Sequence, residues 1–234
     1  MKPVFAVFTL LLLCISAAAQ RPTAVRPRAA AARPRIPAAV PVKQANDSAG
    51  TESDRTYTNS QFGFEITLPE HWVKAGDDFR EEMRSKGFDL DLKAPDDVSA
   101  PNKIRIDRAL KNVVVLLTAY RSVAGASDSG ILRISAEDLT AAPEIRDAVD
   151  YFDLMRSQYR LMKLPTDFKY SETQAEKLGT RQFAFLDISS AAGKKRLYAT
   201  IKNRHAIMFT LSYKTDQDLQ NIRQMIARGK FSIK

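Results

Sequence analysis

The stretch that sets the fold is residues 56–72, TYTNSQFGFEITLPEHW. Within it, four apolar side chains alternate with small or polar ones: Phe62, Phe64, Ile66 and Leu68. This period of two predicts a half-buried β-strand. Pro69 ends the strand because it has no N–H to donate to a neighbouring strand. Trp72, the single tryptophan, supplies a large apolar side chain. The stretch therefore marks the start of a folded domain.

Residues 1–19 have the features of a secretory signal. Lys2 supplies the positive charge, residues 4–15 are almost wholly apolar, and residues 17–19 are alanines that fit a cleavage site. The apolar run is shorter than the ~20 residues that a membrane-spanning helix needs. We therefore expect export, cleavage after Ala19, a periplasmic or secreted location, and no transmembrane helix in the mature chain.

The single cysteine, Cys14, lies inside this signal. A lipoprotein signal has a small residue before its cysteine, and Leu13 is not small, so lipidation is disfavoured. After cleavage the chain has no cysteine, which excludes disulfides, a thiolate nucleophile and cysteine-based metal sites. A hydrophobic core must then hold the exported domain together.

Residues 20–55 form a basic, proline-rich segment. Prolines recur among alanines and arginines, and no acidic residue occurs before Asp47. This composition predicts a disordered, extended arm. Its candidate contacts to an anionic envelope surface, such as lipid headgroups or cell-wall polymers, are Arg21, Arg26, Arg28, Arg33, Arg35 and Lys43. The alternative is a solvated spacer that its own charge keeps extended.

The net charge of +9 is concentrated near the N-terminus. Lys2 gives +1 and residues 20–55 contribute +4, which leaves only +4 for residues 56–234. Because export also separates the chain from nucleic acid, we expect no nucleic-acid partner. The expected partner is an envelope protein or an anionic envelope surface.

Residues 56–234 are predicted to form one domain in which helices interrupt a series of strands. We predict helices over residues 77–87, from near Pro143 to Pro165, and from Thr215 onward. We predict strands over residues 111–121, 131–135, 168–177, 182–189, 195–202 and 205–213, the first of them central and buried, with loops over residues 93–102 and 122–130. This order suits an α+β fold in which helices pack on an antiparallel sheet.

Two of the helices carry stronger sequence signals. The long helix has one apolar stripe, made by Val149, Phe152, Met155, Tyr159 and Met162. In the last helix, Thr215 and Asp218 have the spacing of a capping box. The core-facing side of that last helix is predicted to be Leu219, Ile222, Met225 and Ile226.

Three segments of the chain match a known pattern: YTNSQFGFEITLPEHW at the start, ISAEDL followed by DYF, and HAIMFTLSYKTDQDLQNIRQMIARGKF at the end. Together they resemble the PsbP-like superfamily, which includes the Mog and DcrB-type proteins. The family positions at the start correspond to Tyr57, Gly63, Phe64, Pro69 and Trp72, and Phe231 matches its terminal phenylalanine. The resemblance covers residues 56–234. It implies an α/β/α sandwich around a mostly antiparallel sheet and a binding or assembly role, and it carries over no functional residue.

The two histidines are the first candidates for a chemical site. His71 with Asp77 and Asp78 would give a metal too few of the ligands that zinc normally takes. His205 is predicted to flank a turn at the surface. The aspartates at 89, 91, 96 and 97 lack the spacing and glycine of an EF-hand.

Other polar motifs also have simpler interpretations. The GASDSG stretch at residues 125–130 lacks the G-x-S-x-G order of a nucleophile elbow, and residues 192–195 form a hairpin turn rather than a phosphate loop. We interpret Glu65, Glu137 and Asp138 as solvated carboxylates. The aromatic residues that could line a ligand groove are predicted to be core: Tyr151, Phe152, Tyr159 and Phe168.

The sequence thus predicts no catalytic, cofactor-binding or metal-binding residue and no cofactor. Our hypothesis is an exported, non-enzymatic binding or accessory module of the cell envelope, acting in assembly or as an adaptor, with a basic N-terminal arm. One alternative is an envelope hydrolase whose site the sequence does not reveal. Another is a scaffold whose basic arm binds anionic envelope surfaces.

Overall fold

The computed structural model describes residues 51, 52, 55–76, 81, 100–121, 130–161, 164, 166–190 and 193–232. The predicted signal, residues 20–50 of the predicted arm, and most of the predicted helix at residues 77–87 lie outside these ranges. So do residues 122–129 of the predicted loop and the four aspartates considered for calcium.

The described residues contain one large sheet of eight strands, in which every pairing is antiparallel. The order is β4-β5-β6-β11-β10-β9-β7, and β8 also pairs with β9. The strands are β4 (Trp72–Lys74), β5 (Val113–Arg121), β6 (Ile131–Asp138), β7 (Lys169–Tyr170), β8 (Gln174–Leu178), β9 (Arg181–Ser190), β10 (Gly193–Lys202) and β11 (His205–Tyr213). The predicted three-strand meander is confirmed as β9, β10 and β11.

A second, smaller sheet brings the two ends of the domain together. It contains β1 (Thr51–Glu52), β2 (Thr56–Asn59), β3 (Phe64–Thr67) and β12 (Lys230–Phe231), in the order β1-β2-β3-β12. Residues 56–72 therefore join both sheets, because β2 and β3 form a hairpin in the small sheet and Trp72 begins β4 in the large one. The pairing of β1 with β2 adds Thr51 and Glu52 to the sheet, at the end of the segment predicted as an arm.

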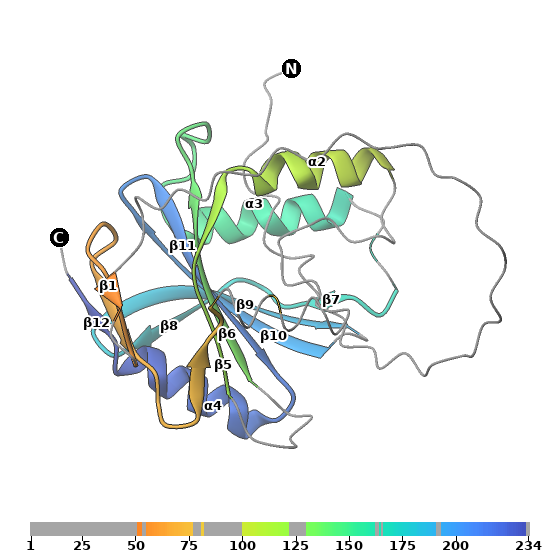
Figure 1. Cartoon of the computed structure of the whole chain (residues 1–234). Coiled ribbons are helices and arrows are strands. Elements are labelled where there is room, and N and C mark those ends of the chain that lie inside the picture. Colours follow the sequence, from red (N-terminus) through yellow and green to blue (C-terminus); the bar gives the residue numbers. More distant parts are fainter. Residues whose placement is uncertain are drawn as a thin grey trace, which may run out of the picture.

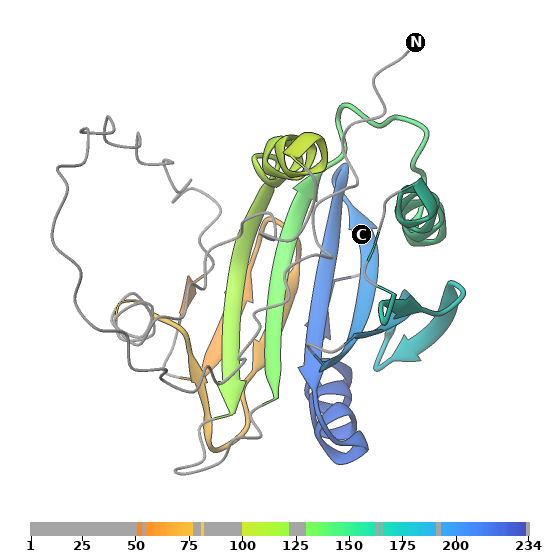
Figure 2. The ribbon, with the colours of Figure 1, turned by 90° about the vertical axis from the view of Figure 1, so that its right-hand side faces the viewer.

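Helices cover the large sheet from both sides (Figures 1 and 2). They are α2 (Ala100–Leu110), α3 (Ala148–Leu161) and α4 (Asp216–Ala227). One face of the sheet packs against α3, and the other packs against α4 and the small sheet. The predicted α+β fold, an α/β/α sandwich around an antiparallel sheet, is confirmed, with the small sheet as an addition to one of its outer layers.

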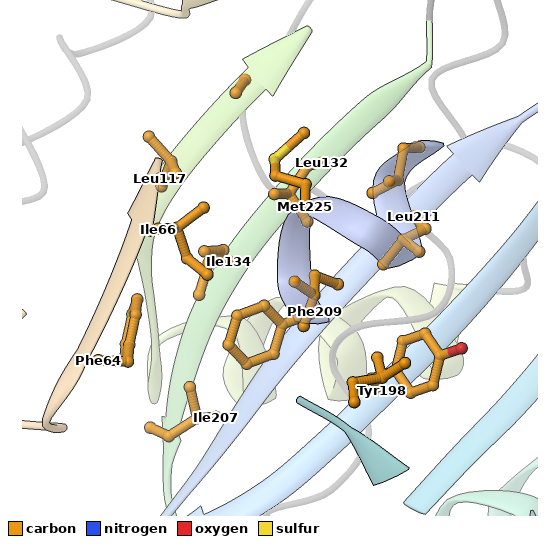
Figure 3. Packing of buried hydrophobic residues seen from close by; sticks show 14 of the residues in the cluster. Phe64, Ile66, Leu117, Leu132, Ile134, Tyr198, Ile207, Phe209, Leu211 and Met225 are labelled. Atoms are coloured by element: carbon orange, nitrogen blue, oxygen red, sulfur yellow. The ribbon is translucent and has the colours of Figure 1, made fainter. Parts of the chain in front are cut away.

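The core beneath the small sheet is dominated by aromatic and branched side chains (Figure 3). The Phe209 ring lies 5.7 Å from Phe64, 5.6 Å from Phe183 and 6.1 Å from Phe231, measured between centroids. The alternating side chains of the opening stretch are all buried, as predicted. Since β3 contributes Phe64 and Ile66 to this cluster, the opening stretch supplies much of the contact between the two sheets.

The predicted stripe of α3 is correct at Phe152, Met155 and Tyr159, which are buried together with Tyr151. Val149 is not part of it, since 44% of its surface is exposed. At about 100° per residue, Val149 lies roughly 90° from the centre of the buried side chains. The three-residue spacing from Val149 to Phe152 therefore led to the wrong prediction that Val149 faces the core.

The prediction of β5 as a central buried strand is wrong. Its neighbour β4 pairs only with Ala119, Tyr120 and Arg121, and β4 is the end strand of the sheet order. Val114, in the first half of β5, is 37% exposed. The valine-rich composition reflects strand propensity, which does not depend on a central position in the sheet.

Two further predictions were wrong along the chain. The strand predicted over residues 168–177 is two short strands, β7 and β8, because their registers on β9 differ by one residue: Tyr170 pairs with Ile188, whereas Gln174 pairs with Phe185. Between them, the Ser171 hydroxyl accepts the Asp187 N–H at 3.1 Å. Residues 100–102, predicted as a loop, begin α2, which the sequence analysis did not anticipate. Pro101 is compatible with a helix here because it lies in the first turn.

The start of α4 agrees with its prediction. Thr215 Oγ1 accepts the Asp218 N–H at 3.1 Å, and Asp218 Oδ2 accepts the Thr215 N–H at 3.3 Å, which completes the capping box. The four residues predicted to face the core are all buried. This helix and the small sheet therefore cover the same face of the large sheet, and α4 covers the part that the small sheet leaves open.

Candidate functional site

The first candidate site is a buried carboxyl group on β6. Glu137 is 2% exposed, and its Oε2 accepts a 2.7 Å hydrogen bond from the Tyr151 hydroxyl on α3. No described residue donates a hydrogen bond to Oε1. Burial raises the pKa of Glu137 to about 8, and the Tyr151 hydrogen bond acts in the opposite direction. The prediction that Glu137 is solvated is therefore wrong.

Asp138, the next residue, behaves as predicted and is exposed. Successive side chains of a strand point to opposite faces, so the two carboxyl groups diverge and cannot act as a pair. The Thr140 side chain and backbone donate hydrogen bonds of 2.6 and 2.8 Å to Asp138, and they hold the pKa of this carboxyl below its usual value. Glu137 thus lies in the core without a second carboxylate beside it.

A second polar cluster connects β8, β9, β10 and α4. Arg196 makes two contacts of 2.7 Å with Asp187, and its guanidinium lies 4.5 Å from the Phe185 ring centroid. The Tyr198 hydroxyl donates to Glu176, which also pairs with Arg223 of α4. Each charge in this cluster faces an opposite charge or a hydroxyl. The cluster is therefore best explained as a polar connection between the sheet and α4.

The third candidate site is a small basic cavity where both sheets meet. Its rim carries Arg181 at the start of β9 and Lys202 at the end of β10. The hydroxyl-bearing residues Thr200 and Ser232 also line it, and its remaining lining is mostly aromatic: Phe62, Phe64, Phe209 and Phe231. The cavity volume is about 10 Å³, close to the space that one water molecule needs.

Three chain segments hold the rim of this cavity in place. Ser232 donates its backbone N–H to the Gly63 carbonyl at 2.7 Å, and Lys202 Nζ lies 3.2 Å from the Ser232 carbonyl. Asn203, in the turn between β10 and β11, donates to the Gln61 carbonyl at 2.9 Å. These contacts join the β2–β3 turn, the β10–β11 turn and the segment after β12.

Gly63 is required by this arrangement. Its φ of +64° lies in the left-handed region that glycine adopts most readily. A Cβ at this position would lie 1.9 Å from Ser232 Oγ and 3.2 Å from Lys202 Nζ. A side chain on Gly63 would therefore displace the rim of the cavity.

The two cations on the rim have neutral hydrogen-bond partners. Arg181 donates through Nε and Nη2 to Thr200 Oγ1, at 3.1 and 2.9 Å. Lys202 donates to the carbonyl and hydroxyl oxygens of Ser232, at 3.2 and 3.3 Å. Within the described ranges, neither forms an ion pair with a carboxylate; Glu65, on β3, pairs instead with Lys230 at 2.7 Å.

The residues that sequence analysis considered for metal binding are not brought together. His71 is exposed in a turn with a φ of +66°, and Asp77 and Asp78 lie outside the described residues. His205 flanks its turn as predicted: its Nδ1 lies 2.7 Å from the Asn203 carbonyl oxygen, and its ring lies 5.2 Å from that of Phe62. The described residues contain no group of three or more side chains arranged to hold a metal ion.

Sequence analysis missed Glu137 and the pair of Arg181 and Lys202. The local pattern around Glu137 was misleading, since Glu137 continues the alternation of Arg133 and Ser135 on β6, whose other face is apolar, and such alternation is typical of a solvated face. Arg181 and Lys202 had no local signal, because they are 21 positions apart and meet only through the pairing of β9 with β10. The six arm cations predicted to contact an anionic surface lie outside the described residues.

None of the described helices combines the length and the apolar character needed to cross a membrane.

No protein-family model and no curated protein sequence matches this chain. Among solved structures, the chain is similar to the solution structure of cyanobacterial PsbP (CyanoP) from Synechocystis sp. PCC 6803, with 11% sequence identity and a TM-score of 0.41. That similarity covers 79% of this chain and 96% of the cyanobacterial chain. It concerns the fold alone.

Proposed function

We propose that this chain is an exported binding or accessory module of the cell envelope, non-enzymatic, with a basic arm that contacts anionic envelope surfaces. The mature protein begins near Gln20 and acts in the periplasm or outside the cell. Its partner is an envelope protein or an anionic envelope surface, not nucleic acid. In this proposal the module works by holding a partner near that surface, as an assembly factor or adaptor does.

The observation that carries the proposal is the order of parts along the chain. An apolar, signal-like run is followed by a segment with six cations before its first acid, and then directly by the strands of the sandwich. A basic segment next to an anionic surface gains about 1 kcal/mol per cation. This order of signal, basic segment and folded domain therefore suits an exported module whose arm holds it close to an envelope surface.

The polar groups of the sandwich are engaged with one another, which disfavours the hydrolase alternative. Glu137 is engaged by Tyr151, Asp187 by Arg196, and Glu176 by both Tyr198 and Arg223. Groups that are fixed to one another in this way orient side chains and specify packing. A ligand cavity for a small molecule usually has a volume of several hundred Å³, far above the roughly 10 Å³ of the cavity at the sheet junction.

The test is cross-linking in the envelope of cells that make the full chain, compared with a chain that lacks residues 20–45. We expect the exported module to form the same protein adducts with and without the arm, and to keep them in high salt. Loss of all adducts on removal of the arm would favour the alternative in which the arm is the working part. Retention of the chain in the cytoplasm would contradict the proposal.

A further inference from the structure

We propose that the cavity between Arg181 and Lys202 binds a phosphate group, either on an anionic lipid headgroup or as free phosphate. This inference rests on the proposed function, because it names the chemistry by which the folded module would contact an envelope surface. It concerns residues of the sandwich itself and not the cations of the arm.

Arg181 and Lys202 have more hydrogen-bond donors than their described contacts use. The Arg181 guanidinium has five N–H groups and the Lys202 ammonium has three. Their described contacts go to Thr200 Oγ1 and to the two oxygens of Ser232. N–H groups on both cations therefore remain for a ligand, and a phosphate oxygen accepts such charge-assisted bonds well.

The cavity carries two positive charges on its rim. Arg181 and Lys202 line one cavity, and no described carboxylate pairs with either. Two half-buried cations in one site repel each other, and an anion between them offsets that repulsion. The nearby Glu65 cannot serve as this anion while it pairs with Lys230. The site is thus complementary to an external anion.

The cavity is small and has a largely aromatic lining. Aromatic side chains form much of its lining, among them Phe64, Phe209 and Phe231, and an apolar lining beside a charge strengthens the attraction between that charge and an anion. A volume of about 10 Å³ admits a single oxygen atom. A phosphate would therefore insert one oxygen and leave the rest of its molecule outside. This geometry fits a headgroup presented at a surface better than an enclosed metabolite.

The first described strand, β1, lies in the same small sheet as the strand that borders the cavity. The segment that leads out of the arm becomes β1, and β1 and β12 belong to the same four-stranded sheet (Figure 1). At about 4.8 Å per strand, β1 lies roughly 14 Å from β12, which borders the cavity. The first described strand after most of the predicted arm therefore belongs to the same small sheet as the strand that borders the cavity.

The test compares variants of the mature chain, residues 20–234, in two assays. The site variant is R181Q with K202Q, and the matched control is R160Q with K194Q, which removes the same charges from exposed positions on α3 and β10. One assay measures binding to phosphatidylglycerol/phosphatidylcholine vesicles and to phosphatidylcholine vesicles. The other follows backbone amide NMR shifts while inorganic phosphate is added.

The inference predicts that the site variant binds phosphatidylglycerol vesicles about a hundredfold more weakly than the control, as expected for the loss of two charge-assisted hydrogen bonds, one from each cation. A conservative variant, R181K with K202R, should retain binding, which separates loss of charge from loss of folding. A second outcome is equal vesicle binding by the site and control variants, while added phosphate shifts the amide signals of Thr200, Lys202 and Ser232 alone. That result would assign the cavity to free phosphate and not to a lipid headgroup.

Equal vesicle affinities of the site and control variants, together with no phosphate shifts at the cavity, would overturn the inference. The proposed function would survive that result if the envelope adducts remained. Conversely, phosphate binding at the cavity of a chain that never leaves the cytoplasm would support the inference and contradict the proposed function.

Discussion

Tyr151 donates a 2.7 Å hydrogen bond to Glu137 Oε2 in the interior between the large sheet and α3. The pair joins β6 to the helix that covers it. Because burial raises the pKa of Glu137 to about 8, this carboxyl is largely protonated in the folded protein at neutral pH. In the unfolded chain its pKa returns to the ordinary value of 4.5. The pair therefore couples folding to pH.

The first prediction follows from the sign of that coupling. Between pH 4.5 and 8 the unfolded chain loses the Glu137 proton while the folded protein keeps it, so stability falls as pH rises. The slope from this group approaches about 1.4 kcal/mol per pH unit. Glu137→Gln should remove that slope and raise the free energy of unfolding near pH 7.5, as measured by urea denaturation across this range.

Asp138→Asn is the matched control, since it removes the neighbouring carboxyl. The pKa of Asp138 is lowered in the folded protein, so its contribution is lost only as pH falls below 3.8. This variant should keep the wild-type slope between pH 4.5 and 8. An unchanged slope in Glu137→Gln would show that Glu137 does not stay protonated in the folded state.

A second prediction concerns the turn beside the basic cavity. Gly63→Ala should destabilise the protein by about 1–3 kcal/mol, because the left-handed conformation disfavours a side chain and the new Cβ would collide with Ser232. Chemical denaturation measures the loss. Gly76→Ala is the control, since no atom lies within 4 Å of its Cβ position. Similar stabilities of the two variants would refute the role given to Gly63.

A third prediction tests the contact between the two sheets. Phe209 is fully buried among Phe64, Phe183 and Phe231, so Phe209→Ala should cost about 3–5 kcal/mol. Leu161→Ala, at a position 84% exposed on α3, should change stability by less than about 0.5 kcal/mol. Thermal unfolding of both variants compares them. A small loss in Phe209→Ala would mean that the sheets do not share this core.

The capping box of α4 gives a fourth prediction. Thr215→Ala removes the hydroxyl that accepts the Asp218 N–H and should cost about 0.5–2 kcal/mol. Thr215→Ser keeps the hydroxyl and should restore most of that stability. Urea denaturation distinguishes the two variants, and equal losses would indicate that the cap is not formed.

Much of the fold could be predicted from local patterns. The alternation at Phe62–Leu68, the meander of β9 to β11 and the cap at Thr215 each depend on residues close together in the chain. Local patterns could not rank strands by their position in the sheet, which is why β5 was expected at the centre. They also missed α2, whose first turn contains a proline and has no acidic residue.

The candidate sites were less predictable, for a physical reason. Whether Glu137 is solvated depends on α3, which begins 11 positions later and covers it. Arg181 and Lys202 meet only because β9 and β10 pair in one register. Single charged residues in strands carry no sign of what lies opposite them, so such sites appear only when the sheet is assembled.

The most direct test of the proposed function is cross-linking of the exported chain in the cell envelope, with and without residues 20–45. We predict that both forms are found outside the cytoplasm and that both give the same salt-resistant protein adducts through the folded module. Adducts that disappear with the arm, or a chain that stays in the cytoplasm, would contradict an exported module that binds its partner through the sandwich.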